Sequence, residues 1–465
     1  MKRLSPTPSP DAGPAIPPRA VGARAPRRLA GKLTLLPLVA ATYFMVAGGP
    51  YGLEDLIGKT GYSASLIILA LTPLLWSLPT ALMVSELASA LPEEGGFYVW
   101  VRRGMGRFWG YQEAWLTLTG SVFEMALYPT LFVDYLGGFA PRLIAGHRGL
   151  ALELAMIATC AAWNTIGARA VGEGSIGLNV LLFLPFVAIV ILAVLLPPVA
   201  ASTSAPGAQI PHLDLIGGIV IAMWNYMGWD NLSTIAGEVD RPQRTYPLAM
   251  CVSVILVIVS YVLPVAAVAH AHLDLGIWTT GGWADAGRAL GGPALAVAVS
   301  AAGAIGAVGT FAALMLSFTR LPVVMAEDGF LPQIFTRRSA KTGAPWVAIL
   351  ACAVAWAVCL PLGFLRLLIL DVLLTGLSIL LEFWALVALR IREPHLPRPY
   401  RVPGGLAGAI AIGIPPLVLV ALGVARNQSE QVGATNELMI GLGIIAAGVL
   451  LYFLSPGSQR GSRPT

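Results

Sequence analysis

A short stretch inside the first apolar segment, Val46–Asp55, constrains the fold more than any other feature of the chain. The apolar run around it extends from Leu33 to Ile57, longer than the about 20 residues that a helix needs to cross a bilayer. Its middle reads Gly-Gly-Pro-Tyr-Gly, in which proline lacks a backbone donor and glycine tolerates non-helical dihedrals. In hydrocarbon, an opened backbone is tolerated only where it is buried in protein or lines a cavity. We therefore predict two half-helices around a polar break, as in the substrate sites of membrane transporters.

The composition also favours a membrane protein. Hydrophobic residues make up 57% of the chain and charged residues 11%, whereas soluble domains carry roughly 25% charged residues. The four cysteines fall inside apolar segments, which is typical of small buried hydrophobes and not of a disulfide set or metal site. No phosphate-binding loop, cofactor motif or metal-ligand spacing is present, so we predict no enzymatic activity, cofactor or bound metal.

The predicted fold class is an all-α integral membrane protein with twelve transmembrane helices. Residues 1–30 are rich in proline and arginine and are predicted to be a disordered cytoplasmic tail. The transporter domain is predicted over 31–457, followed by a short cytoplasmic tail at 458–465. The predicted spans cover residues 33–58, 63–90, 108–137, 149–166, 176–198, 215–238, 247–270, 292–320, 345–361, 364–389, 405–424 and 436–455.

The distribution of basic residues predicts the orientation, because lysine and arginine concentrate in cytoplasmic loops. With both termini inside, all but six of the 29 basic residues fall on the cytoplasmic side. The net charge of +5 thus follows membrane topology, and no nucleic acid partner is predicted. The bilayer itself is the expected environment, at the plasma membrane, and the sequence leaves the oligomeric state open. The six basic residues that do not fall on the predicted cytoplasmic side are Lys59, Arg142, Arg148, Arg288, Arg366 and Arg426.

The sixth predicted span repeats the irregularity of the first. A polar, glycine-containing patch, Trp224–Asn231, lies in the middle of residues 215–238 and places Asp230 inside the membrane. Interruptions five spans apart suggest an inverted repeat of five plus five spans, over about 33–198 and 215–389. Broken helices 1 and 6 then occupy matching places in the two halves, and the two spans within 405–455 are additions.

Three blocks outside these breaks resemble the amino acid/polyamine/organocation transporter superfamily. They are Pro92–Val101 after span 2, Ala236–Pro242 after span 6, and Ala326–Pro332 between spans 8 and 9. Within the superfamily, Gly48–Asp55 and Arg398–Pro403 are similar to plant-type polyamine uptake permeases. The resemblance implies a fold with broken helices 1 and 6 and transport of a polyamine or amino acid.

Carboxylates inside hydrocarbon are the informative site candidates, because such residues usually face a cavity or a transport path. Glu124 lies near the middle of span 3, and Tyr128 is one helical turn beyond it on the same face. Asp230 lies at the second break and Glu54 just after the first. Each acid also fits a structural role: packing for Glu124, helix capping for Asp230 and solvation for Glu54. Asp230 and Glu124 are the candidates for proton coupling.

The remaining candidates come from the two breaks. Aromatic faces attract ammonium groups, so Trp224 and Trp229 are candidate substrate contacts as well as candidate packing residues. The resemblance places Trp224 where similar exchangers carry a tryptophan that covers bound substrate. The full predicted substrate-binding set is Ala47, Gly48, Gly49, Glu54, Glu124, Tyr128, Trp224, Asn225, Trp229 and Asp230.

These features lead to one main hypothesis and two rivals. The main hypothesis is a secondary transporter that imports a small cationic polyamine, such as putrescine or spermidine, with protons or the membrane potential as the driving force. The first rival is an amino acid permease or exchanger, in which the amides of a half-helix hold a carboxylate. The second rival is a sensor, or a subunit of a larger complex, that does not transport.

Overall fold

The computed structural model describes residues 32–197, 213–279, 281–360, 364–427 and 437–459. The predicted tail at 1–30 lies outside this range, as does most of the tail at 458–465. Every element that the described residues form is helical, apart from one isolated β-bridge between Leu33 and Val239. Within these described ranges, eight helices are long and apolar enough to cross a membrane, and four shorter apolar helices lie at predicted spans 1, 6, 9 and 12. The twelve-span count and the inverted repeat remain predictions.

The first predicted span is broken where its sequence indicates. Helix α1 (Leu35–Val46) ends before the two glycines, and helix α2 (Glu54–Thr72) begins after Leu53. Gly61 interrupts α2 with a positive φ of 70°, so the outer half of span 1 and the start of span 2 form one bent helix. A π-helical turn, η1 (Pro73–Ser77), then joins α2 to α3 (Leu78–Ala90).

The sixth predicted span is broken in the same way. Helix α9 (Leu215–Asn225) ends at the polar patch, and a 3-10 helix, η2 (Asn231–Glu238), follows it. Between them, residues 226–230 form no helix. Both interruptions predicted from glycine and proline are therefore present.

The other predicted spans correspond to helices with small shifts of boundary. Span 5 begins at Ala168 and not near 176, because Gly167 adopts a φ of 114° and turns the chain directly from α7 into α8. Span 8 begins at Gly282, and Gly292 kinks it. The larger helices are α5 (Arg107–Gly137), α7 (Arg148–Ile166), α8 (Ala168–Leu195), α10 (Pro242–His270), α11 (Gly282–Phe318), α13 (Trp346–Val358), α14 (Phe364–Arg392), α15 (Gly405–Asn427) and α16 (Glu437–Leu454). The short ones are α4 (Phe97–Met105), α6 (Pro141–Ile144), η3 (Leu275–Ile277), α12 (Leu321–Glu327), η4 (Gln333–Thr336) and α17 (Pro456–Gln459).

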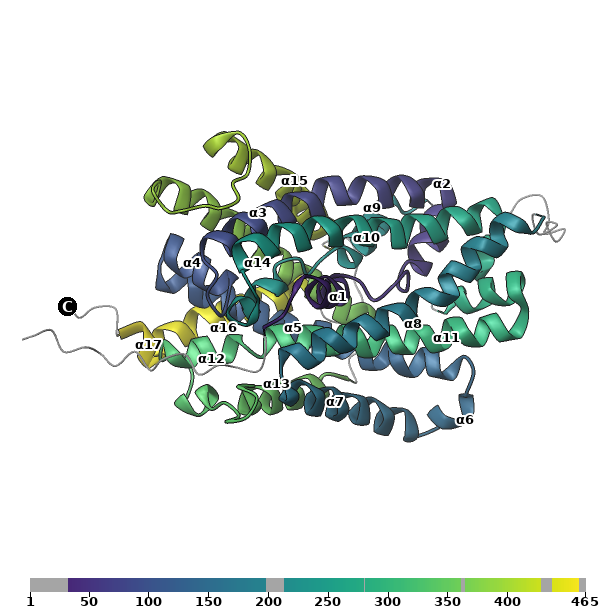
Figure 1. Cartoon of the computed structure of the whole chain (residues 1–465), viewed down its shortest axis with the longest axis horizontal. Coiled ribbons are helices and arrows are strands. Elements are labelled where there is room, and N and C mark those ends of the chain that lie inside the picture. Colours follow the sequence, from purple (N-terminus) through teal and green to yellow (C-terminus); the bar gives the residue numbers. More distant parts are fainter. Residues whose placement is uncertain (1–31, 198–212, 280, 361–363, 428–436, 460–465) are drawn as a thin grey trace, which may run out of the picture.

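Helix α1 forms the centre of the bundle. It packs against α8, α10 and α11, and its residues from Leu38 to Val46 are all buried. A helix that is apolar all round is expected in a core position. In Figure 1, α1 lies in the middle of the molecule, with α7 near one edge and α15 near the opposite edge. The breaks that follow α1 and α9 therefore lie inside protein, where an opened backbone is tolerated.

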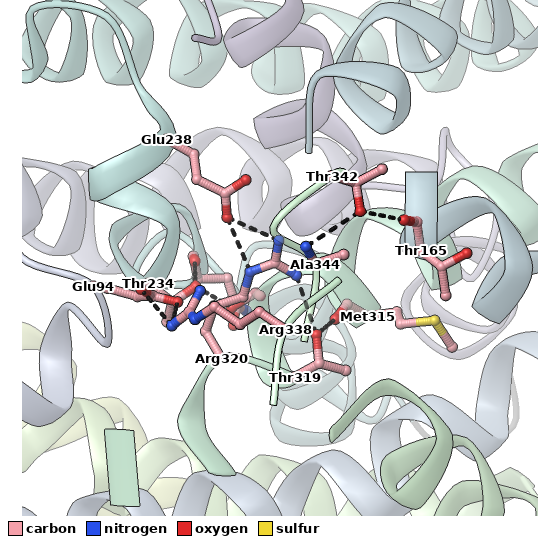
Figure 2. A network of polar contacts seen from close by, with 12 residues as sticks. Glu94, Thr165, Thr234, Glu238, Met315, Thr319, Arg320, Arg338, Thr342 and Ala344 are labelled. Atoms are coloured by element: carbon pink, nitrogen blue, oxygen red, sulfur yellow. Dashed lines mark hydrogen bonds and ion pairs between the residues drawn. The ribbon is translucent and has the colours of Figure 1, made fainter. Parts of the chain in front are cut away.

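Ion pairs gather at the end of the bundle that the sequence predicts to be cytoplasmic, here called the inner side. Arg320, almost fully buried, donates to Glu238 at 2.8 Å, and Arg338 donates to Glu94 at 2.8 Å. Figure 2 shows Arg320 between Glu238 and Thr319. Leu33, just before α1, also hydrogen bonds through its amide to the Glu238 carbonyl. The Leu33–Glu238 hydrogen bond thus ties span 1 to span 6 at their inner ends, and the Arg320 ion pair ties span 6 to the chain just after α11.

Candidate functional site

The two breaks lie side by side, and glycines make this approach possible. A methyl group at Gly228 would lie 2.2 Å from the carbonyl oxygen of Met45, the penultimate residue of α1. A methyl group at Gly52 would lie 2.8 Å from the Trp224 ring at the end of α9. Both glycines have a φ near 90°, a conformation that residues with a side chain rarely adopt. Each break thus needs glycine both for its backbone conformation and for its contact with the other broken span.

A cavity of about 40 Å³ lies between the breaks, enough for a few water molecules. Helix α5 contributes two tyrosines to its wall, and α10 contributes Tyr261. The Tyr261 hydroxyl donates to the Asn225 carbonyl at 2.9 Å, so one α9 carbonyl freed by the break is satisfied by this wall. The cavity is lined by Val46, Gly48, Tyr51, Tyr128, Leu131, Tyr135, Trp224, Asn225, Tyr261, Gly303, Ala307 and Thr310.

Two tyrosine–glutamate pairs border this cavity. The Tyr128 hydroxyl donates to Oε1 of Glu124 at 3.1 Å, and the Tyr135 hydroxyl donates to Oε1 of Glu54 at 2.9 Å. The tyrosines are seven residues apart on α5, two helical turns, and therefore share one face. Each tyrosine lines the cavity while its glutamate lies behind it. Since a phenol that donates its proton to a carboxylate keeps its oxygen lone pairs, both pairs present acceptors to the cavity.

Helix α11 packs against the first break through small residues, as its glycine spacing suggests. A methyl group at Gly306 would lie 2.6 Å from the Gly48 carbonyl oxygen, and one at Gly309 would lie 2.6 Å from the Phe44 ring. Gly303 is similarly close to the Tyr135 ring. Close packing of α11 thus positions both the broken backbone and one of the two tyrosines.

The predicted site residues divide into three groups. Gly48, Tyr128, Trp224 and Asn225 line the cavity. Glu54 and Glu124 lie directly behind its tyrosines, and the second oxygen of Glu54 accepts the Gly52 amide at 2.6 Å. The structure does not place the other four predicted residues on the cavity wall, and they are Ala47, Gly49, Trp229 and Asp230.

Asp230 is buried without filling the capping role that its sequence position allows. It precedes η2, yet its side chain makes no capping hydrogen bond there, and its Oδ1 has no hydrogen-bond partner. The neighbouring Trp229 is fully buried, and its indole nitrogen has no partner either. Asp230 therefore stays a candidate for binding a cation or a proton, although it does not line the cavity.

Several residues of this region were not predicted from sequence. Tyr51, Tyr135 and Tyr261 line the cavity. Only Tyr135 could have been found from the sequence, because it follows Tyr128 by seven residues and therefore lies on the same helix face. Glu113 and Asp371 are additional buried acids inside spans 3 and 10. The rule that selected Glu124, an acid inside an apolar run, also applies to both of them.

Metal ligation has no support in the described part of the chain. No group of three or more histidine, cysteine, aspartate or glutamate side chains in it could hold a metal ion. Of the four cysteines, Cys160 and Cys352 are buried, and all four are free thiols. The carboxylates, phenols and backbone groups of the site offer hydrogen bonding and charge interaction.

Comparison with known proteins agrees with this architecture. A family model described as amino acid permease matches residues 36–450. The polyamine transporter PUT1 of Oryza sativa subsp. japonica is 34% identical over 90% of this chain and 77% of its own length. The polyamine transporter RMV1 of Arabidopsis thaliana is 34% identical over 88% of this chain and 84% of its own length.

A more distant relative has a different substrate in its name. The serine/threonine exchanger SteT of Bacillus subtilis is 24% identical over 70% of this chain and 75% of its own length. The family match spans most of the chain and includes both breaks. The protein therefore belongs to the amino acid permease family, within the amino acid/polyamine/organocation superfamily, and is similar to plant polyamine transporters.

Proposed function

We propose that this protein is a secondary transporter that imports a cationic polyamine, such as putrescine or spermidine, across the plasma membrane by alternating access. The observation that carries the proposal is the cavity between the two breaks, bordered by two tyrosines that each hydrogen bond to a membrane-embedded glutamate. No lysine or arginine is among the residues that line it. The names of the plant relatives support the same class of substrate.

The chemistry of the cavity suits an ammonium group. An ammonium has three donors and no acceptor, and the tyrosine oxygens and freed backbone carbonyls supply acceptors. Glu54 and Glu124 lie behind the tyrosines and contribute negative charge in a low-dielectric environment, where it acts strongly. The Trp224 ring adds a face for cation–π contact, worth about 0.5–2 kcal/mol. Positive groups are thus favoured over neutral or negative ones.

Transport requires the inner side to open and close. The pairing of Leu33 with Val239 holds spans 1 and 6 together at that side. The ion pair between Arg320 and Glu238 holds span 6 to the chain just after α11 (Figure 2). Release of an amine inward would separate these contacts. Since the cavity holds only a few water molecules, binding of an amine would also move the Trp224 or tyrosine side chains that narrow it.

The driving force in this proposal is the membrane potential or a proton gradient. A cation moving inward gains about 2.3 kcal/mol per charge per 100 mV, so a diamine can be accumulated without sodium. Asp230 and Glu124 are the candidate proton carriers, because both are acids within the membrane near the breaks. The proposed orientation places both termini in the cytoplasm.

An amino acid permease is the second candidate, favoured by the name of the serine/threonine exchanger. In that function, free amides at the start of a half-helix would hold the substrate carboxylate. Here the Gly52 amide, just before α2, already donates to Oε2 of Glu54 at 2.6 Å. The chain's own carboxylate thus occupies a position that an amino acid carboxylate would need, which favours the polyamine.

Uptake of radiolabelled spermidine by proteoliposomes containing the purified protein tests the proposal. We expect uptake driven by an inside-negative potential, competition by putrescine and spermine, and no competition by leucine or serine. Competition by amino acids but not by polyamines would establish the amino acid permease instead. Absence of uptake for every substrate would leave the non-transporting sensor or complex subunit.

A further inference from the structure

Three buried carboxylates outside the cavity wall form what we call the inner acid cluster: Glu113 on α5, Asp230 in the second break and Glu382 on α14. Each is at most 3% exposed. In the low-dielectric interior, the charge of Asp230 reaches both glutamates. Ser378, one turn before Glu382, donates to Glu113 at 2.6 Å, which fixes the facing sides of α14 and α5.

The inner acid cluster lacks the partners that a structural acid normally has. Both oxygens of Glu382, Oε2 of Glu113 and Oδ1 of Asp230 have no hydrogen-bond partner. Among the described residues, no lysine or arginine forms an ion pair with any of the three. Buried carboxylate oxygens without partners are costly. A cationic ligand that donates hydrogen bonds would satisfy them.

A second level of acids lies along the same two helices. Glu124 follows Glu113 by eleven residues on α5, and Asp371 precedes Glu382 by eleven residues on α14. Eleven residues correspond to about three helical turns and about 16 Å, so each helix presents both of its acids on one face. A methyl group at Gly120, one turn before Glu124, would lie 3.8 Å from Oδ1 of Asp371, so Glu124 and Asp371 form an outer pair at the same contact of α5 with α14.

This spacing matches the length of a long linear polyamine. At about 1.2 Å per bond in an extended chain, the terminal nitrogens of spermine are about 15 Å apart and those of putrescine about 6 Å. A tetra-amine can therefore reach from the outer pair to the inner cluster, whereas a diamine can contact only one level.

We propose that Glu113, Asp230 and Glu382 form a second amine-binding site, which holds the far end of a tetra-amine such as spermine whose near end lies at Glu124 and Asp371. The inference rests on the proposed polyamine function and deepens it. It makes chain length the property by which this transporter selects its substrate. The terminal ammonium donates to the unpartnered oxygens of Glu382 and Glu113 and is attracted by the charge of Asp230, and the flanking amines lie along the α5–α14 interface.

Equilibrium binding of radiolabelled spermine and putrescine to the purified full-length protein tests this assignment. Wild type should bind spermine at least tenfold more tightly than putrescine. Glu382→Gln and Glu113→Gln, which keep side-chain size, should each weaken spermine binding tenfold or more, the loss expected for a hydrogen bond to a charged group. Both variants should change putrescine binding less than threefold.

Two controls separate this inference from the proposed function and from misfolding. Glu124→Gln should weaken binding of both amines, whereas Asp134→Asn, which alters an exposed acid on the same helix, should affect neither. Unfolding temperatures identify any variant that fails to fold, in which case the wild-type comparison of spermine with putrescine decides. Equal affinities in wild type, or equal effects of Glu382→Gln and Glu113→Gln on both amines, would overturn the second site. Absence of binding of either amine to wild type would overturn the polyamine function itself.

Discussion

Acidic residues have opposite surroundings in two regions of this protein. At the inner side, Glu86, Glu94 and Glu238 are each paired with at least one arginine. In the centre, the acids behind the cavity and in the inner acid cluster form no ion pair with a described arginine or lysine, although most are more deeply buried. The first group stabilises the protein and holds loops together. The second group leaves its charge uncompensated, which we interpret as the capacity to bind a cation.

The largest expected effect breaks a compensated pair at the inner side. Glu86 is fully buried between Arg390 and Arg398, and it also accepts the Val402 amide at 2.7 Å. Glu86→Gln leaves two nearly buried guanidinium groups without their counter-charge, so we expect a loss of about 3–5 kcal/mol in the free energy of unfolding. The unfolding temperature and the yield of monodisperse protein in detergent measure it.

A matched control for Glu86 is available on the same side. Glu393 pairs with Arg103 at 2.7 Å, and both side chains are about one-third exposed. Exposed pairs contribute only about 0–1 kcal/mol, so Glu393→Gln should leave the unfolding temperature nearly unchanged. Similar destabilisation by both substitutions would contradict the view that burial and double pairing make Glu86 structural.

The second prediction concerns the second break, which contains Asp230. Gly228→Ala would place a methyl group 2.2 Å from the Met45 carbonyl oxygen in a left-handed conformation. We expect a cost of at least about 2 kcal/mol in folding, because strain and overpacking add. Polyamine uptake by the Gly228→Ala protein should also fall. Gly177→Ala is the control, since a methyl group there meets nothing within 4 Å.

The third prediction concerns the uncompensated acids. Glu124→Gln should lower the affinity for spermidine in uptake by about 10–100-fold, as expected for loss of a hydrogen bond to a charged group. The unfolding temperature should not fall, because no ion pair is broken. Glu94→Gln, at a paired acid of the inner side, should leave the affinity unchanged. A wild-type affinity in Glu124→Gln would remove Glu124 from the site.

The smallest expected effect concerns the aromatic wall. Trp224→Leu removes a cation–π contact worth about 0.5–2 kcal/mol, so the affinity for spermidine should fall about 2–30-fold. Trp384, which is 67% exposed on the outside of α14, provides the control. Trp384→Leu should leave the affinity unchanged. Equal effects of the two substitutions would indicate that Trp224 only packs.

The breaks could be predicted from sequence because their signals are local. Gly48, Gly49 and Pro50 disfavour a helix wherever they occur, and Gly228 does so in the second break. The cavity wall could not be predicted in the same way. In a membrane bundle the lipid is as apolar as the protein interior, so the pattern of an apolar helix does not show which face is inward. Tyr51 and Tyr261 belong to the wall only because α8, α10 and α11 pack around α1.

For the buried acids, too, the sequence predicts their position in a membrane span but not their partners. Glu124 and Asp230 are recognisable from sequence as charges inside apolar segments. Glu86 pairs with an arginine from another helix, whereas Glu113 and Glu382 pair with no described arginine. The sequence of a single segment does not show which of its acids will have such a partner. The unpartnered oxygens of Glu382 make it a candidate for binding, a property that only the packed structure reveals.

A cryo-EM structure of the purified protein with bound spermidine tests the central claim most directly. The account predicts amine density between the two breaks, with ammonium groups within hydrogen-bonding distance of Tyr128 and Tyr135 and close to Glu124 and Glu54. It also predicts movement of the side chains that narrow the cavity. Spermidine bound elsewhere, with both tyrosine–glutamate pairs intact and the cavity empty, would contradict it.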